Sequence, residues 1–337
     1  MILGDTGPSG RKRLGVVGTL VWDTIHQRDG RTVPVAEWGG VAYALAGLSA
    51  ALSEEWEIVP LLKIGGDLSE EALRFLRSFP RVDMQTGIRI VPEANNKVEL
   101  RYLNDERRTE RLSGGVPPWN WPELAPLAAT CDALYVNFIS GFEMDLDAAR
   151  ALRVGFDGPS YADLHSLFMG IDPRGLRVPQ ELPAWGAWLR CFDAVQMNED
   201  EFELLGRAWG DPWHLAADLV GPELKLIAVT LGPKGAAYVA GPGFSSEPLD
   251  WPAQRKGVGQ PGPTTSARIP VAEGAETGDP TGCGDVWGAT LFATLLSGSP
   301  LDQAMQQANR QAARNVRHRG ARGLRDHLMG RLSERMP

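Results

Sequence analysis

A short glycine-rich segment near residue 285 holds the residues whose chemistry is easiest to infer. It reads Gly278-Asp-Pro-Thr-Gly-Cys-Gly-Asp285. Glycines at a helix start let backbone N–H groups approach an anion closely, and the helix N-terminus adds partial positive charge. A carboxylate at this position would repel a bound anion. Its presence therefore indicates that it has a chemical task. We therefore expect Gly282, Cys283 and Gly284 to hold a phosphoryl group while Asp285 removes a proton from an attacking hydroxyl.

The ordinary alternative is a glycine turn before a helix, with Asp285 as a capping carboxylate. The following stretch, from Val286 to Leu296, is apolar on nearly all sides, which is typical of a buried helix. The glycine-rich segment therefore ends against a core element. A rigid anion site is favoured there over a surface turn.

Composition limits the classes of protein that the chain can represent. It has 337 residues, a formal net charge of −8, 43% hydrophobic residues and no long basic run, which argues against nucleic acid as a partner. The three cysteines, Cys131, Cys191 and Cys283, are too far apart for a CxxC metal site. No apolar run reaches membrane-spanning length, and residues 1–13 lack the apolar core of a signal peptide. We expect a cytoplasmic protein without a membrane partner.

Apolar periodicity predicts alternating strands and helices, and hence a mainly parallel sheet covered on both faces. The extended segments at 32–37, 87–91 and 97–103 break this alternation and predict a small separate sheet. Residues 241–263 are rich in Pro and Gly and predict a surface excursion. We expect strands at 14–21, 57–62, 133–138, within 154–163, 194–197, 226–231 and 236–240, and helices at 41–52, 69–77, 145–153, 199–205, 286–296 and 301–316.

Four polar residues lie at or just past the ends of predicted strands: Asp23, Asp163, Asn198 and Thr230. Ligands of open α/β sheets bind beyond the carboxyl ends of the strands. We therefore expect these side chains to converge at one edge of the sheet.

The segment Asp279-Pro-Thr-Gly-Cys-Gly-Asp285 resembles the C-terminal signature of the ribokinase-like (PfkB-type) carbohydrate kinase family. Further matches keep the family's order between Leu14 and Leu324. They are Asp23, Gly39-Gly40, Gly65-Gly66-Asp67, the Asn-x-x-Glu motif with Asn198 and Glu201, the Thr-x-Gly-x-x-Gly loop with Thr230, Gly232 and Gly235, and Ala308-Asn309 in a late helix.

The resemblance implies a three-layer αβα Rossmann-like domain with a small β-sheet lid. We expect one kinase domain over 14–325, a lid from about 31–38 and 86–112, and tails at 1–13 and 326–337. It also implies transfer of the γ-phosphoryl of ATP to a hydroxyl, with Mg²⁺. A homodimer through the lid is a further expectation.

On the donor side, the resemblance implies that Asn198 and Glu201 organise Mg²⁺ through water and that Thr230, Gly232 and Gly235 line the nucleotide. A capping box explains the first pair equally well, and a hairpin turn explains the second set. Two further roles follow from the resemblance: Asn309 beside the adenine, and Asp279 at a metal site, where some relatives hold a monovalent cation. Lys234 could reach phosphate or solvent.

On the acceptor side, the resemblance implies that Asp23, Gly39 and Gly40 hold substrate hydroxyls. Asp163 is a further candidate, and His165 beside it is interpreted as a loop residue. Arg101 or Arg107 could touch an anionic substrate, although a solvated lid edge explains their segment more simply.

The chain departs from the ribokinase branch at three positions. Where that branch has polar residues, this chain has Val21, Val41 and Ala44. This argues against ribose. Tyr43 favours a less polar acceptor such as a nucleoside or cyclitol. Trp22 and Trp38 could stack on a substrate ring or pack the seam between domain and lid.

Two other classes of protein compete with a kinase. The segment from Gly282 to Gly288 resembles a loosened dinucleotide fingerprint of an NAD(P)-binding oxidoreductase, but Asp285 would face the pyrophosphate. A non-catalytic sensor of nucleotides or sugars could keep the same fold, yet it would not need the base and the anion site.

Overall fold

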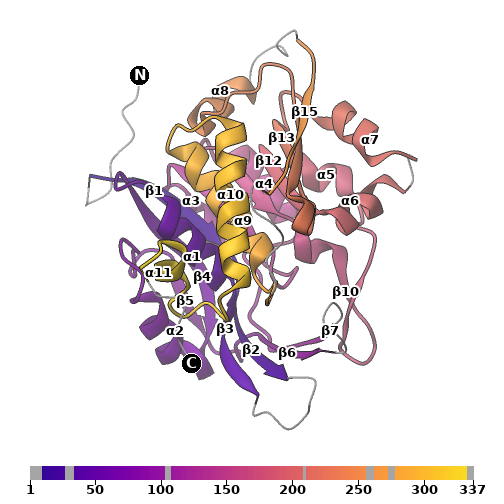
Figure 1. Cartoon of the computed structure of the whole chain (residues 1–337). Coiled ribbons are helices and arrows are strands. Elements are labelled where there is room, and N and C mark those ends of the chain that lie inside the picture. Colours follow the sequence, from indigo (N-terminus) through magenta and orange to yellow (C-terminus); the bar gives the residue numbers. More distant parts are fainter. Residues whose placement is uncertain are drawn as a thin grey trace.

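A nine-stranded sheet forms the centre of the molecule (Figure 1). The computed structural model describes residues 10–26, 34–102, 108–207, 210–255, 262–271 and 278–331. The sheet order is β15-β14-β13-β12-β9-β8-β1-β4-β5, and neighbouring strands are parallel except that β14 is antiparallel to both β13 and β15. Its strands are β1 (Lys12–Val17), β4 (Trp56–Gly65), β5 (Ile88–Val91), β8 (Ala133–Asn137), β9 (Ser160–Asp163), β12 (Ala194–Asn198), β13 (Leu226–Thr230), β14 (Ala236–Ala240) and β15 (Thr265–Ile269).

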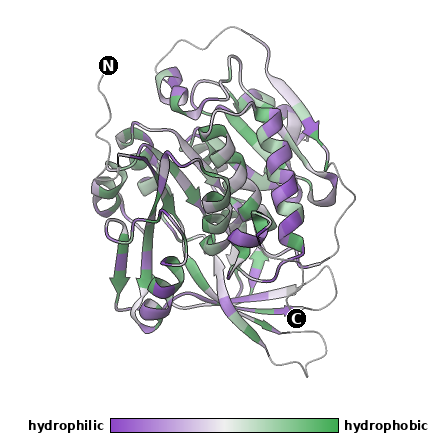
Figure 2. Cartoon of the chain, turned by 60° about the vertical axis from the view of Figure 1, so that its left-hand side comes forward, coloured by the Kyte–Doolittle hydropathy of each residue, from purple (hydrophilic) through white to green (hydrophobic). Residues whose placement is uncertain are grey.

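Helices cover both faces of this sheet. One apolar core joins it to α1 (Val41–Ala51), α2 (Ser69–Leu76), α8 (Trp251–Arg255), α9 (Cys283–Leu296), α10 (Leu301–Val316) and α11 (Leu324–Leu328). The opposite core joins it to α3 (Trp121–Ala128), α4 (Leu146–Gly155), α5 (Trp185–Leu189), α6 (Glu199–Gly206) and α7 (Pro212–Leu219). Hydrophobic residues gather on the strands and on the inner faces of the helices (Figure 2). The predicted three-layer αβα fold is confirmed.

Helix α9 is largely buried on its face of the sheet. Ten of its residues, from Val286 to Leu296, are buried, and it packs between α1 and α10. This agrees with its apolar sequence, because a helix that is apolar all round must be covered on all sides. Its N-terminus is therefore fixed by core packing.

A second, four-stranded sheet forms the lid, in the order β3-β2-β6-β7. Its strands are β2 (Leu20–His26), β3 (Val35–Gly40), β6 (Lys97–Tyr102) and β7 (Arg108–Ser113). It lies below the central sheet in Figure 1. Four apolar side chains, Val21, Ile25, Val98 and Leu100, form its own small core, against which Leu112 and Ile139 pack.

The first predicted strand, 14–21, is wrong as a single strand. Strand β1 ends at Val17, and the chain leaves the central sheet at Gly18 before β2 starts in the lid. A side chain at Gly18 would meet Val41 Cγ2 at 2.6 Å, so the bend depends on close packing against α1. The lid consequently includes 20–26, which we did not expect, while β5 belongs to the central sheet.

Other elements escaped the sequence patterns. Helices α3 and α7 were not expected, although side chains of Asn120 and Asp211 cap them and a proline opens each. The hairpin of β10 (Met169–Ile171) and β11 (Arg177–Pro179) was also missed. In the segment 241–263, α8 carries the fully buried Trp251, so this part is more than a surface excursion. Residues 256–261 of that segment lie outside the described residues.

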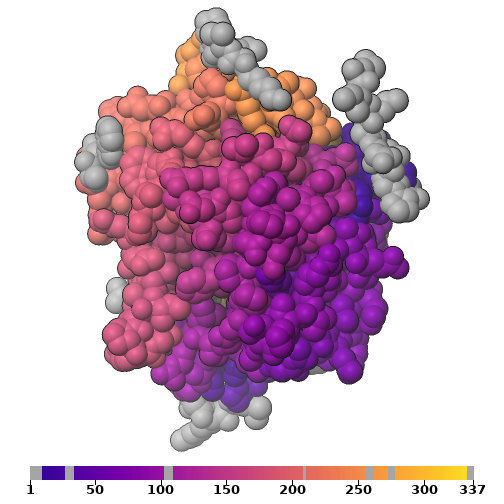
Figure 3. All heavy atoms as spheres, turned by 180° about the vertical axis from the view of Figure 1, so that it is seen from behind, coloured from indigo at the N-terminus to yellow at the C-terminus, as the bar shows by residue number. Residues whose placement is uncertain are grey.

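Seen from behind, the first half of the chain and its pink middle part lie side by side on the surface (Figure 3). Within the described ranges, no helix combines the length and the apolar character that a membrane crossing requires.

Candidate active site

The N-terminus of α9 presents the glycine-rich segment at the edge of the central sheet. Gly282 caps the helix in the left-handed region, with φ 75°, and a side chain there would meet the Tyr43 ring at 2.2 Å. Only glycine fits both demands. Tyr43 is buried, and its ring packs against the segment. It is therefore not exposed to a substrate, although its residue type had suggested a less polar acceptor. The Cys283 N–H is already used, since it donates to the Pro280 carbonyl at 3.1 Å.

Asp285 lies in the first turn of α9 and receives a hydrogen bond from across the sheet edge. Asn137 Nδ2 donates to Asp285 Oδ1 at 2.9 Å. Asn137 is the last residue of β8 and is fully buried. A donor at this distance stabilises the carboxylate and fixes its orientation. The Gly284 N–H belongs to the first helical turn, where backbone N–H groups have no intrahelical acceptor.

Two buried polar side chains, Gln196 and Asp163, lie next to the glycine-rich segment. Gln196 Nε2 donates to the Gly284 carbonyl at 2.9 Å and to Asp163 Oδ2 at 3.1 Å. Burial, together with the nearby Asp285 carboxylate, raises the pKa of Asp163 to about 8. Asp163 is thus buried behind the site, and we withdraw its direct substrate contact. Gln196, which the sequence did not single out, links Asp163 to the base-bearing helix.

The strand β12 ends at a second polar group, where Asn198 and Glu201 form a complete capping box. Asn198 Oδ1 accepts from the Glu201 N–H at 3.0 Å, and Glu201 Oε2 accepts from the Asn198 N–H at 2.8 Å. His165 Nδ1 also bonds Glu201 Oε1. Partial desolvation of the His165 ring would lower its pKa, but the Glu201 carboxylate outweighs this effect and raises the pKa to about 9. His165 is therefore a cation next to Glu201, which is more than a loop histidine.

The turn after β13 lies next to this group. Thr230 ends β13 directly beside Asn198 of β12 in the parallel register. Gly232 and Gly235 have φ values of 56° and 97°, and a side chain at Gly235 would meet the Ile269 carbonyl at 2.2 Å. These glycines therefore shape the turn, whatever it binds. Lys234 is exposed and pairs with Glu199 at 3.0 Å.

Asn309 and Asp279 lie apart from the donor group. Asn309 is buried, donates to the Ile269 carbonyl at 3.0 Å and accepts from Trp287 Nε1 at 2.7 Å. Its amide thus helps to hold α9, α10 and β15 together, and the expected place of Asn309 beside the adenine stays a prediction. Asp279 Oδ1 accepts from the Thr281 N–H at 2.9 Å. In the part of the chain that the structure describes, no three His, Cys, Asp or Glu side chains cluster as metal ligands.

The lid supplies the acceptor-side residues, and Asp23 lies in the lid strand β2 instead of at the end of β1. A side chain at Gly39 would meet Asp23 Oδ2 at 1.8 Å, so Gly39 makes room for this carboxylate. At Gly40, φ is 61° and a side chain would meet the Thr19 carbonyl at 2.6 Å. Both glycines are required by the packing of lid and α1, and they bring Asp23 to the start of α1.

The two tryptophans face away from this group. Trp22 and Trp38 stand opposite each other in the β2–β3 register, with their ring centroids 4.9 Å apart. Trp38 is buried and also contacts Phe75 of α2 at 6.2 Å between centroids. Because side chains alternate along a strand, Asp23 lies on the other face. The tryptophans therefore pack the seam of domain and lid.

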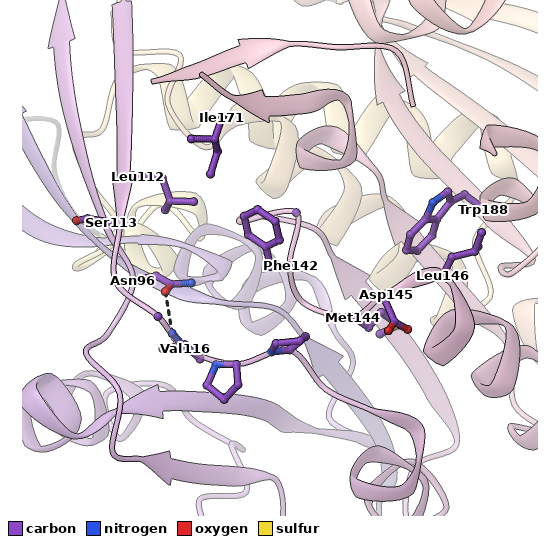
Figure 4. Close-up of a pocket in the computed structure, with 15 residues that line it drawn as sticks. Asn96, Leu112, Ser113, Val116, Phe142, Met144, Asp145, Leu146, Ile171 and Trp188 are labelled. Atoms are coloured by element: carbon purple, nitrogen blue, oxygen red, sulfur yellow. Dashed lines mark hydrogen bonds between the residues drawn. The ribbon is translucent and has the colours of Figure 1, made fainter. Parts of the chain in front are cut away.

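A separate pocket of about 520 Å³ lies between the end of β7, the loop after β8, β10 and α5 (Figure 4). Phe142, Ile171 and Trp188 make it mainly apolar. None of the strand-end polar residues lines it, so the polar side chains, and not this cavity, locate the candidate site.

Comparisons with known proteins concern the family and the fold. Residues 176–327 match the family model described as pfkB family carbohydrate kinase. A search of curated protein sequences gives no match.

Solved structures extend the likeness over nearly the whole chain. A nucleoside kinase of Burkholderia thailandensis in complex with inosine has a TM-score of 0.64 and 15% identity, covering 95% of this chain and 96% of that one. A ribokinase of Thermotoga maritima has a TM-score of 0.64 and 17% identity, covering 95% and 98%. A pyrophosphate-dependent kinase in the ribokinase family, complexed with a pyrophosphate analogue and myo-inositol, has a TM-score of 0.65 and 16% identity, covering 91% and 96%.

These likenesses place the chain in the class of ribokinase-fold α/β proteins. The predicted resemblance to the ribokinase-like (PfkB-type) carbohydrate kinase family is confirmed, by the family match in the C-terminal part and by the shared fold over the described chain.

Proposed function

We propose that this protein is an ATP-dependent kinase that transfers the γ-phosphoryl group to a hydroxyl of a sugar, nucleoside or cyclitol. The observation that carries the proposal is Asp285 in the first turn of α9, held by Asn137 at 2.9 Å beside glycine N–H groups. A carboxylate in a phosphate cradle is consistent with a base that acts on the attacking hydroxyl.

In the proposed reaction, Asp285 takes the proton of the acceptor hydroxyl while its oxygen attacks the γ-phosphorus and ADP leaves. The Gly282 and Gly284 N–H groups, with the positive end of α9, stabilise the charge on the transferring phosphoryl. Asn137 holds the Asp285 carboxylate in orientation. Gln196 holds the Gly284 carbonyl and thus the first turn of the helix.

Magnesium would neutralise charge on the donor phosphates. Mg²⁺ usually keeps several waters and is bound through phosphates and one or two carboxylates. Glu201 fits this pattern only through water, because Asn198 and His165 already occupy its two oxygens. The cationic His165 next to Glu201 is itself suited to face a donor phosphate.

The acceptor would lie between Asp285 and the lid, near Asp23 and Gly39. The apolar lid core, including Val21, favours an acceptor less polar than ribose. The nucleoside kinase complexed with inosine and the kinase complexed with myo-inositol make nucleosides and cyclitols the first compounds to test.

The test is phosphoryl transfer by the full chain with ATP–Mg²⁺, and in parallel with pyrophosphate, against a panel of nucleosides, pentoses, hexoses, inositols and vitamin alcohols. We expect ATP-dependent product with at least one acceptor and its near-complete loss in Asp285→Asn, with ATP binding retained. ATP binding without transfer to any acceptor would favour a sensor. A thermal shift with NAD(P) but none with ATP–Mg²⁺ would favour the oxidoreductase.

A further inference from the structure

Arg177 of β11 is a half-buried cation that the proposed mechanism does not use. Its Nη1 donates to the Ile139 carbonyl at 2.8 Å. Its Nε and Nη2 are buried and have no hydrogen-bond partner. Leaving donors of a charged group unpaired in the interior costs free energy, so such groups usually have a partner.

Three other arginines with mostly covered side chains differ from Arg177, because carboxylates pair with them. Arg13 pairs with Glu57 and Asp83, and Arg153 and Arg255 both pair with Asp193. Burial lowers the pKa of Arg177, and the charges of the Glu110 and Glu143 carboxylates oppose this effect. Glu143 is occupied, since it accepts the N–H groups of residues 139–141.

The position of Arg177 faces the acceptor side of the lid. Strand β11 continues the lid sheet beyond β7 through an antiparallel bridge between Leu176 and Arg111. Bridged residues share a face and neighbours along a strand alternate, so Arg177 lies on the face opposite to Arg111, together with Leu112. Leu112 and Ile139 pack against the inner lid core, which includes Val21 on the strand of Asp23.

Ile139 connects Arg177 to the base. It follows Asn137, the partner of Asp285, by two residues, and its Cγ2 lies 2.8 Å from where a side chain on Gly40 would begin. The loop is held rigidly, since Ser166 Oγ also donates to the Ile139 carbonyl. The acceptor region thus has the base Asp285 at one end and an unsatisfied arginine at the other.

We infer that the acceptor of this protein carries an anionic group, a carboxylate or a phosphate ester, which Arg177 binds while Asp285 activates a hydroxyl at the other end. This inference rests on the proposed function and narrows its substrate class. Arg177 offers two donors in a fork, the arrangement that matches the paired oxygens of these anions. The sequence had pointed to Arg101 or Arg107 for such a role. Arg101 is instead exposed and pairs with Glu99, and Arg107 lies outside the described residues.

The test measures binding to the full chain by calorimetry without nucleotide, so it does not depend on turnover. Each matched series contains a neutral sugar, its sugar acid and its phosphate ester: ribose, ribonate and ribose 5-phosphate, and glucose, gluconate and glucose 6-phosphate. We expect one anionic class to bind at least roughly tenfold more tightly than its neutral member, and the two anionic arms separate carboxylate from phosphate.

Arg177→Gln should remove that preference, and Arg177→Lys should restore part of it. Arg174→Gln is the matched control, because Arg174 lies on the same hairpin, is exposed and pairs with Asp172. Equal binding of neutral and anionic members, no binding of any anionic member, or an equal loss of both in Arg177→Gln would overturn the inference. So would a loss confined to ATP binding, which would assign Arg177 to the donor phosphates.

The outcomes keep this inference separate from the kinase proposal. Anionic preference without phosphoryl transfer would support the inference and refute the kinase. Transfer to neutral acceptors alone would do the reverse.

Discussion

Removing the Asn137 amide should make Asp285 a weaker acid and shift the pH dependence of the reaction. Asn137 Nδ2 donates to Asp285 Oδ1 at 2.9 Å, and Asn137 is fully buried, so solvent cannot easily replace the bond. A hydrogen bond to a charged group is worth about 1.5–3 kcal/mol, and one pKa unit corresponds to about 1.4 kcal/mol. In Asn137→Ala the pKa of Asp285 should therefore rise by about 1–2 units.

The sign follows from the proposed role of Asp285 as a base. The base must be ionised, so activity falls as pH drops through its pKa. A higher pKa moves the acidic limb of kcat/KM to higher pH. The assay is ADP release between pH 5 and 9 with the best acceptor of the panel. The Asp285 carboxyl can also be titrated directly by ¹³C NMR, assigned with Asp285→Asn.

Asn315→Ala is a matched control for this variant. Asn315 is also fully buried, and its Nδ2 donates to the Thr281 carbonyl at 2.8 Å, on the loop before α9. This control loses a buried amide of the same size without touching Asp285. It should leave the acidic limb in place even where it lowers the rate. An unchanged limb in Asn137→Ala, with activity merely scaled down, would refute the assigned role of Asn137.

Three further predictions concern the cradle, the metal and the buried carboxyl. Gly282→Ala should lower kcat at least roughly tenfold, because its Cβ would meet the Tyr43 ring at 2.2 Å. Gly298→Ala is the matched control: Gly298 has φ 82° and open space around it, so the variant carries the same backbone strain and should leave kcat intact. Glu201→Gln should raise the Mg²⁺ concentration for half-maximal activity by about 10–100-fold, because the loss of a residue that holds a metal through water or through another ligand commonly weakens metal binding by this factor. An unchanged Mg²⁺ titration would show that Glu201 does not belong to the metal site. Wild-type Asp163 stays protonated in the folded state up to about pH 8 but ionises near 3.8 when unfolded, so folding stability should fall across this window. Asp163→Asn cannot ionise and lacks this loss. Its melting temperature should therefore increase relative to that of the wild type as the pH is raised from 5 to 8. A difference in melting temperature that stays constant over this range would contradict the raised pKa.

Much of the fold could be predicted from local patterns. The buried strands and the apolar helix α9 have a strong signal, because each must be apolar where it meets its neighbours. Asp163, Asn198 and Thr230 end β9, β12 and β13, as their positions after apolar runs indicated. Asn137 ends β8 by the same rule, and applying that rule to every predicted strand would have found it.

Other features left no local signal. The break at Gly18 depends on Val41 in α1, and it moved Asp23 from the central sheet into the lid. Trp22 and Trp38 are compatible with stacking or packing until the strand register fixes their face. Asn309 bonds Trp287 and the Ile269 carbonyl, which its place in the chain did not indicate.

The sequence by itself determined the glycine-rich cradle, the position of Asp285 within it and the buried helix that anchors both. Each of these depends on residues that are adjacent along the chain, where backbone geometry and apolar periodicity act directly. The tertiary structure decided which groups complete the site. Asn137 bonds Asp285 across 148 residues, and Arg177 lies on a hairpin that joins the lid. Such contacts follow from the packing of whole layers, which brings distant residues together without a pattern in either segment.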